Sequence, residues 1–148
     1  MISSIEGDLF TCGVPAIAHG VNCSGVMGAG IAVQFRDRWP VMYETYQIRC
    51  REGRMVPGDV MTWPVRGMDV FNLATQDQPG ADAHPWMIAA AVGRMIQMIV
   101  TGSYAPGRKV AMPEIGCGIG GLSRADLDLA LSPYEHAPVD LVVVRYKP

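Results

Sequence analysis

The chain has 148 residues, a formal net charge of −2, and 49% hydrophobic residues. This length and apolar share suit one folded domain over residues 1–148 and exclude a disordered chain. The slight negative charge argues against a protein that grips nucleic acid through a broad basic face.

Strands and helices are predicted to alternate along the chain. In chain order, we expect strands at 1–6 and 16–22, a helix at 30–38, a stop at Pro40 or a second helix at 41–52, strands at 59–64 and 69–74, a helix at 85–101, a strand at 109–112, a helix at 123–131 and a strand at 139–146. The predicted strands are short and nearly continuously apolar, which is typical of a sheet covered on both faces. The predicted fold class is therefore α/β, with three α/β/α layers around a central mixed, mostly parallel sheet.

Two glycine-rich segments each follow an apolar run. The first is Val26–Ala32, and the second is Ile115–Leu122, with four glycines among six consecutive residues. Glycines between a strand and a helix let backbone N–H groups gather around an anion. Both segments lie at predicted strand ends, so we expect them to converge on one cleft and to bind a ligand with two phosphates. A tight turn is the alternative for the first segment. Neither segment has the lysine of a P-loop, so we expect phosphates to be bound rather than transferred.

Three polar residues near the predicted strand ends are candidates for chemistry. Asp8 could accept a hydrogen bond from an exocyclic amine such as that of adenine, or form a turn. Asn22 could orient a sugar hydroxyl or a water molecule, or form a turn. His19, on an apolar strand, is either a catalytic base or a buried core residue.

The four cysteines form no Cys-x-x-Cys pair, and no histidine follows any of them at zinc-ligand spacing. We therefore expect a reduced protein without a disulfide framework, a metal site or a cofactor.

A cluster of five arginines between positions 36 and 54 is interpreted as solvated helix surface. We see no signal peptide and no apolar run of membrane-spanning length, and we expect a cytoplasmic monomer that does not associate with membranes.

Taken together, these segments resemble the macrodomain family of ADP-ribose-binding α/β modules. The resemblance covers most of the chain. It rests on Gly7-Asp8-Leu9, on Val21-Asn22-Cys23 followed by Met27–Ala32, and on Met112–Leu122. Within the family, the chain looks most similar to the branch with terminal ADP-ribose protein glycohydrolase, ADP-ribose 1″-phosphate phosphatase and the antitoxins that remove ADP-ribose from DNA.

The resemblance implies a role for each of these segments. Asp8 would accept from the adenine amine, the first segment would face the distal ribose and one phosphate, and the second would wrap the diphosphate. Tyr146 would pack near the adenine, or only at the sheet edge. The implied ligand-binding residues are Asp8, Leu9, Asn22, Met27, Gly28, Ala29, Gly30, Ile31, Ala32, Thr75, Ile115, Gly116, Cys117, Gly118, Ile119, Gly120 and Tyr146. The implied partner is ADP-ribose or an ADP-ribosylated molecule, with nucleic acid among the candidates.

One departure from the family pattern concerns catalysis. In the glycohydrolase and antitoxin members, a lysine follows the strand that precedes the long helix, whereas Gln76 or its neighbour stands there in this chain. Glutamine cannot form a Schiff-base-type adduct with an opened ribose. The candidate catalytic residues are then His19 or Asp77 as the base that activates a water molecule, together with Asn22 and Gln76. His84, in the segment 78–84, is a further candidate acid or base, or an exposed loop histidine.

Two functions therefore stay open. The first is a hydrolase that acts at the distal ribose of ADP-ribose and removes a 1″-phosphate, an acyl ester or an attached macromolecule. The second is a module or scavenger that binds ADP-ribose without chemistry. The missing lysine favours the second function, and a free-standing domain favours the first. We expect the first function, the hydrolase.

Overall fold

The computed structural model describes residues 1–148, which form one six-stranded sheet and four α-helices. The strands are β1 (Ile2–Gly7), β2 (Ala16–Val21), β3 (Val60–Val65), β4 (Met68–Ala74), β5 (Lys109–Pro113) and β6 (Asp140–Tyr146). The helices are α1 (Ile31–Arg38), α2 (Pro40–Arg51), α3 (Pro85–Thr101) and α4 (Arg124–Leu131), and two 3₁₀ turns span Pro106–Arg108 and Ser132–Tyr134.

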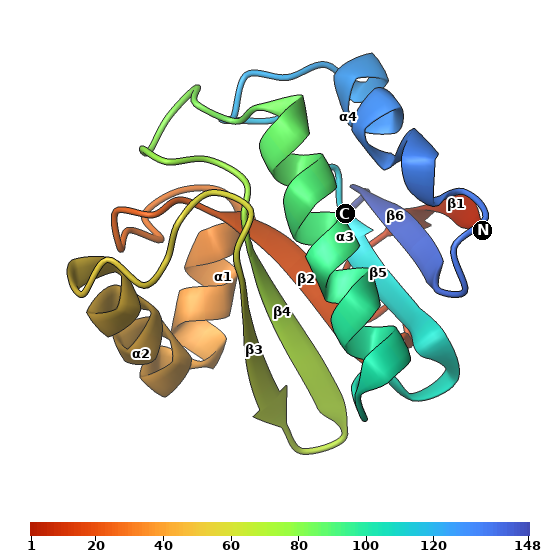
Figure 1. Ribbon diagram of the computed structural model, residues 1–148, viewed down its shortest axis with the longest axis horizontal. Helices are drawn as coiled ribbons and strands as arrows, with labels where there is room; N and C mark the ends of the chain where they lie inside the picture. The colour runs from red at the N-terminus through yellow and green to blue at the C-terminus, as the bar shows by residue number, and fades with distance from the viewer.

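The strand order is β1-β6-β5-β2-β4-β3, and every neighbouring pair is parallel except β3 and β4. Helices α3 and α4 cover one face of this sheet, and α1 and α2 cover the other (Figure 1). Along β6, Leu141 and Val143 pack under α3 and α4, whereas Val142 and Val144 pack on the opposite face. Both faces are thus apolar, which explains the nearly continuous hydrophobic runs in the sequence. The predicted three-layer fold with a mixed, mostly parallel sheet is confirmed.

Of the two alternatives predicted at Pro40, the structure shows the second helix rather than a stop. Pro40 occupies the first turn of α2, where a missing N–H group removes no hydrogen bond from the helix. The longest helix, α3, has 17 residues, and no helix has the length and hydropathy that crossing a bilayer requires.

Helix α4 begins with a capping box formed by Ser123 and Asp126. The Asp126 N–H group donates to Ser123 Oγ at 3.1 Å, and the Ser123 N–H group donates to Asp126 Oδ2 at 2.9 Å. Replacing Ser123 with alanine removes the first bond, and we expect it to lower the free energy of unfolding by about 1 kcal/mol in urea denaturation. Ser103→Ala, at an exposed loop serine, is the control and should change it by less than about 0.5 kcal/mol. Equal effects would contradict the assignment of the cap.

Candidate functional site

The parallel strands end at one edge of the sheet, and two connected cavities lie there. The larger, of about 550 Å³, lies between the first glycine loop (Val26–Gly30) and the second glycine loop (Ile115–Leu122). A Cβ atom built on Gly30 would lie 3.7 Å from Ile119 Cδ1, so the two loops face each other. The residues that line this cavity include Asn22, Gly28, Ala29, Gly30, Ile31, Ala32, Thr75, Gln76, Ile115, Gly116, Gly118, Ile119 and Gly120. The expected convergence of the two loops is thus present in the structure.

The smaller cavity, of about 260 Å³, lies where β1 and β6 end. Asp8, Leu9 and Tyr146 line it, and it shares Ile31, Pro113 and Glu114 with the larger cavity. The two cavities therefore form one groove along the carboxyl edge of the sheet, where α/β folds bind ligands. Asp8 Oδ1 accepts a hydrogen bond from the Phe10 N–H group at 2.8 Å. The Asp8 carboxylate thus stabilises a turn through Oδ1, and its Oδ2 atom is free to accept a hydrogen bond from a ligand.

Backbone N–H groups without acceptors line the larger cavity from both sides. The N–H groups of Gly118, Ile119 and Gly120 donate to no protein atom, and neither do those of the residues from Gly28 to Ala32. Helix α1 starts here without a side-chain cap, because Gly30 is its N-cap. Free N–H groups at a helix start and in a glycine loop attract anions. No lysine or arginine lines either cavity, so an anion in the groove would be held by the main chain.

The glycines of the second loop have different roles. Gly116 has a φ of +79°, which side chains rarely adopt, and a Cβ atom on Gly120 would lie 2.8 Å from the Gly116 carbonyl oxygen. These two positions require glycine to form the loop. A Cβ atom on Gly118 would meet nothing within 4 Å, although Gly118 also lines the cavity. Gly118 therefore leaves space that a ligand can occupy.

The Asn22 side chain organises the first glycine loop. Its Oδ1 atom accepts from the Ser24 N–H group at 3.0 Å and from the Tyr46 hydroxyl at 2.8 Å, and its Nδ2 atom donates to the Val26 carbonyl oxygen at 2.8 Å. Asn22 lines the larger cavity but is only 8% exposed. Most hydrogen-bonding capacity of the Asn22 side chain is thus used within the protein, which agrees with the turn-forming alternative. Only the capacity that these bonds leave unused is available to a ligand.

His19 lies in the core and reaches neither cavity. Its side chain is fully buried, its ring stacks on Phe35 with centroids 3.6 Å apart, and its Nε2 atom is hydrogen-bonded to Asn72 Oδ1 at 2.6 Å. Burial lowers the pKa of His19 to about 4, because a charged imidazole would lose its hydration. The expectation of a catalytic base at His19 is therefore corrected, and the core alternative holds.

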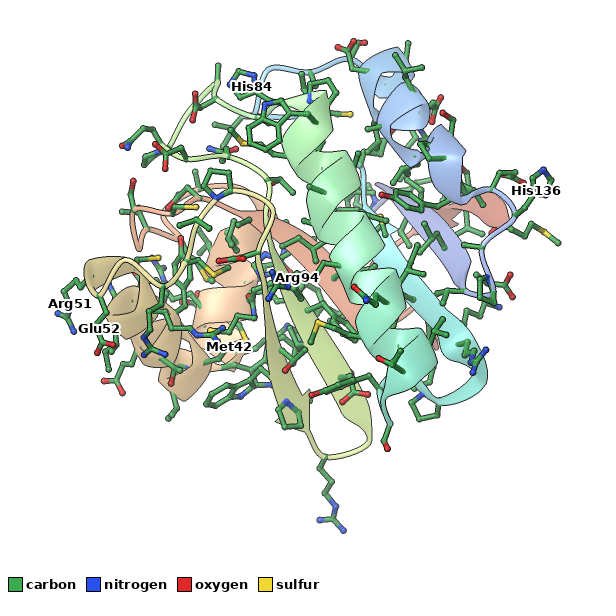
Figure 2. All side chains as sticks on the ribbon, viewed as in Figure 1. Met42, Arg51, Glu52, His84, Arg94 and His136 are labelled. Atoms are coloured by element: carbon green, nitrogen blue, oxygen red, sulfur yellow. The ribbon has the colours of Figure 1, made fainter.

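The polar segment after β4 contributes one candidate to the groove. Gln76 lines the larger cavity, but its Nε2 atom donates to the carbonyl oxygens of Gln78 at 2.6 Å and Gly80 at 3.1 Å. Asp77 is exposed and lines neither cavity, so its placement does not support a catalytic base. His84 lies at the N-terminal end of α3 (Figure 2), half exposed and 3.5 Å from Asp82 Oδ1, outside both cavities.

Two residues of the implied ligand set point their side chains into the protein. Met27 is 1% exposed and belongs to the core beneath α1 and α2. Cys117 packs against the other core, and its Sγ atom contacts the Ser123 carbonyl oxygen. Neither residue lines a cavity, so the structure does not place their side chains where they could contact a ligand. A glycine-rich loop turns too sharply for neighbouring side chains to share one direction.

Sequence reasoning missed Glu114, which lines both cavities. It is the only ionisable side chain that lines the larger cavity, and its Oε2 atom accepts from Arg124 Nη1 at 2.9 Å. One signal was available, because Glu114 lies two residues after the end of a predicted strand, as Asp8 does, although the sequence does not show which cavity that strand end meets. No group of three or more His, Cys, Asp or Glu side chains gathers at a point where it could hold a metal ion.

Comparisons with known proteins match most or all of the chain. A family model described as Macro domain matches residues 18–128. A Mycobacterium tuberculosis protein named DNA ADP-ribosyl glycohydrolase is 33% identical over 153 residues, covering 100% of this chain and 42% of its own length. The chain thus spans less than half the length of that relative. A Candida albicans ADP-ribose 1″-phosphate phosphatase is 27% identical, with 97% of this chain and 100% of that protein covered. The solved macrodomain of M. tuberculosis DarG superposes with a TM-score of 0.84 at 32% identity, over 100% of this chain and 98% of that one.

Proposed function

Because this chain belongs to the macro domain family, we propose that its groove binds ADP-ribose and that the protein hydrolyses a group attached to the distal ribose. The observation that carries the proposal is the set of free N–H groups from two facing glycine loops, in a groove without lysine or arginine. Main-chain donors of this kind suit a diphosphate.

The successive parts of ADP-ribose can be assigned to the two cavities in order. The adenine would occupy the smaller cavity, where Asp8 Oδ2 can accept from the exocyclic amine and Tyr146 offers an aromatic ring. The diphosphate would lie between the start of α1 and Gly118 to Gly120. The distal ribose would then reach the end of the larger cavity where Thr75 and Gln76 lie.

Hydrolysis at the distal ribose is supported by the names of the relatives, which act on ADP-ribosylated DNA and on ADP-ribose 1″-phosphate. At that end of this cavity, Asn22, Thr75 and Gln76 supply polar atoms but no imidazole and no amine. Catalysis would therefore depend on holding the reacting bond and a water molecule in place and on stabilising developing negative charge by the loop N–H groups.

Binding without catalysis is the second candidate function. It is favoured by the absence of any ionisable side chain but Glu114 around the larger cavity, and by the engagement of the Gln76 amide with its own loop. A general base usually contributes about 10²–10⁴-fold to a rate, and no such base faces the distal end.

Two measurements on the same protein separate these functions. The protein is incubated with ADP-ribose 1″-phosphate, O-acetyl-ADP-ribose and an ADP-ribosylated DNA oligonucleotide, and release of ADP-ribose is followed; ADP-ribose binding is measured by calorimetry. We expect saturable binding and turnover of at least one substrate. Binding without turnover of any substrate would support the non-catalytic module instead. No binding in well-folded protein would overturn both functions.

A further inference from the structure

The two cavities meet at a carboxylate. Only Ile31, Pro113 and Glu114 line both of them, and Glu114 is the one polar side chain among the three. Our inference rests on the proposed binding of ADP-ribose: the adenosine ribose connects the adenine to the diphosphate, so it must lie where the two cavities join. The sugar hydroxyl groups of that ribose would then face Glu114.

The Glu114 carboxylate is held in place from behind. Its Oε2 atom accepts from Arg124 Nη1 at 2.9 Å, and the same guanidinium donates through Nε to Asp128 Oδ1 at 2.8 Å and through Nη2 to Ser4 Oγ at 2.7 Å. Three partners thus fix Arg124, and Arg124 lines neither cavity. The Glu114 Oε1 atom has no hydrogen-bond partner in the protein, so an oriented acceptor remains at the junction.

We propose that Glu114 accepts a hydrogen bond from the 2′-hydroxyl of the adenosine ribose and restricts the site to ligands in which that hydroxyl carries no phosphate. In dinucleotide-binding folds, a carboxylate that accepts from the ribose 2′-hydroxyl favours the unphosphorylated cofactor, whereas an arginine nearby accommodates the 2′-phosphate. Here the arginine that contacts Glu114, Arg124, is also paired with Asp128, and it lines neither cavity.

Charge adds to this selection. The smaller cavity contains two carboxylates, Asp8 and Glu114, and no basic side chain lines either cavity. A 2′-phosphate would bring about two further negative charges next to Glu114, and no basic side chain in the lining of either cavity would compensate them. An unphosphorylated ribose meets only a hydrogen-bond acceptor at the same place. The groove thus favours ADP-ribose over ADP-ribose 2′-phosphate.

The test is calorimetric titration of the wild-type protein and Glu114→Gln with ADP-ribose, ADP-ribose 2′-phosphate and the 2′-deoxyadenosine form of ADP-ribose. For the wild type, we expect the 2′-phosphate to bind about 100-fold more weakly than ADP-ribose, and the 2′-deoxy ligand about 10-fold more weakly. Glu114→Gln removes the charge but keeps the shape and an acceptor oxygen. It should bring the affinity for the 2′-phosphate to within about 10-fold of that for ADP-ribose.

Glu52→Gln is the matched control. Glu52 accepts from Arg54 Nε at 2.8 Å, lies at the C-terminal end of α2 (Figure 2), and lines neither cavity. This variant should keep the wild-type preference. Wild-type protein that binds ADP-ribose and its 2′-phosphate equally, or a Glu114→Gln variant with an unchanged preference, would overturn the role of Glu114 and leave the proposed function standing. Wild-type protein that binds neither ligand would overturn the proposed function together with this inference. If Glu114→Gln does not fold, the wild-type affinities for the three ligands still decide the outcome.

Discussion

Gly118→Glu should abolish ADP-ribose binding and leave the fold intact. Gly118 lines the larger cavity next to two other free N–H groups, and a Cβ atom there would meet nothing within 4 Å. The new side chain is therefore free of steric conflict with the protein and can enter the space assigned to the diphosphate. Its carboxylate would occupy the anion site itself and repel a second anion. We expect the dissociation constant measured by calorimetry to rise by at least about 100-fold.

The control for this variant is Ser103→Glu, which introduces the same side chain at an exposed position in the loop between α3 and β5. This loop follows the end of α3, whereas the groove lies near its start, so binding should stay unchanged. Both variants should melt within a few degrees of the wild type, because neither position is buried. Undiminished binding by Gly118→Glu would show that the phosphates do not contact the second glycine loop.

The sequence predicts the layers of this fold better than it predicts the side chains that face the ligand. Glycine segments after apolar strands locate the groove, because parallel strands place their carboxyl ends at one edge. The order of the strands in the sheet cannot be predicted from these local segments. The pairing of β2 with both β4 and β5 depends on contacts between residues 53 and 94 positions apart, such as Ile17 with Val70 and with Ala111, and no local pattern records them.

The direction of single side chains is harder to predict for a related reason. Both faces of β2 are buried, so its apolar run does not show alternation, and His19 could be assigned to either face or to the strand end. Its hydrogen-bond partner, Asn72, lies on β4, 53 positions away in the sequence. Neither residue alone indicates that the two satisfy each other in the core. The same limit applies to Glu114, whose place at the junction of the cavities depends on β1 and β6 as well as on β5.

The buried position of His19 predicts how the stability of the protein depends on pH. The Nε2 atom is paired with Asn72 Oδ1, while Nδ1 is buried without a hydrogen-bond partner. Protonation of the ring would place a charge against Phe35 in the apolar core, which is why the pKa falls from 6.5 to about 4. The unfolded chain, with its ordinary histidine pKa, binds a proton below pH 6.5 that the folded chain does not bind until about pH 4. This contribution to stability is therefore complete above pH 6.5 and is lost as the pH falls through that window, by about 3 kcal/mol in total.

Urea denaturation of the wild type and His19→Gln, measured at intervals from pH 7.5 down to about pH 4, tests this account. The glutamine can still donate to Asn72 Oδ1 but cannot titrate. We expect the variant to be less stable at neutral pH by about 1–3 kcal/mol, because the stacked ring is lost, and to lose less stability than the wild type on acidification.

The carboxyl groups of Asp82 and Asp126, whose pKa values are lowered by hydrogen bonds from backbone N–H groups, act equally in both proteins and cancel in the comparison. His136→Gln, at the exposed histidine before β6 (Figure 2), should retain the wild-type dependence on pH. If His19→Gln and the wild type lose the same stability between pH 6.5 and 4, the buried imidazole does not titrate as its surroundings require.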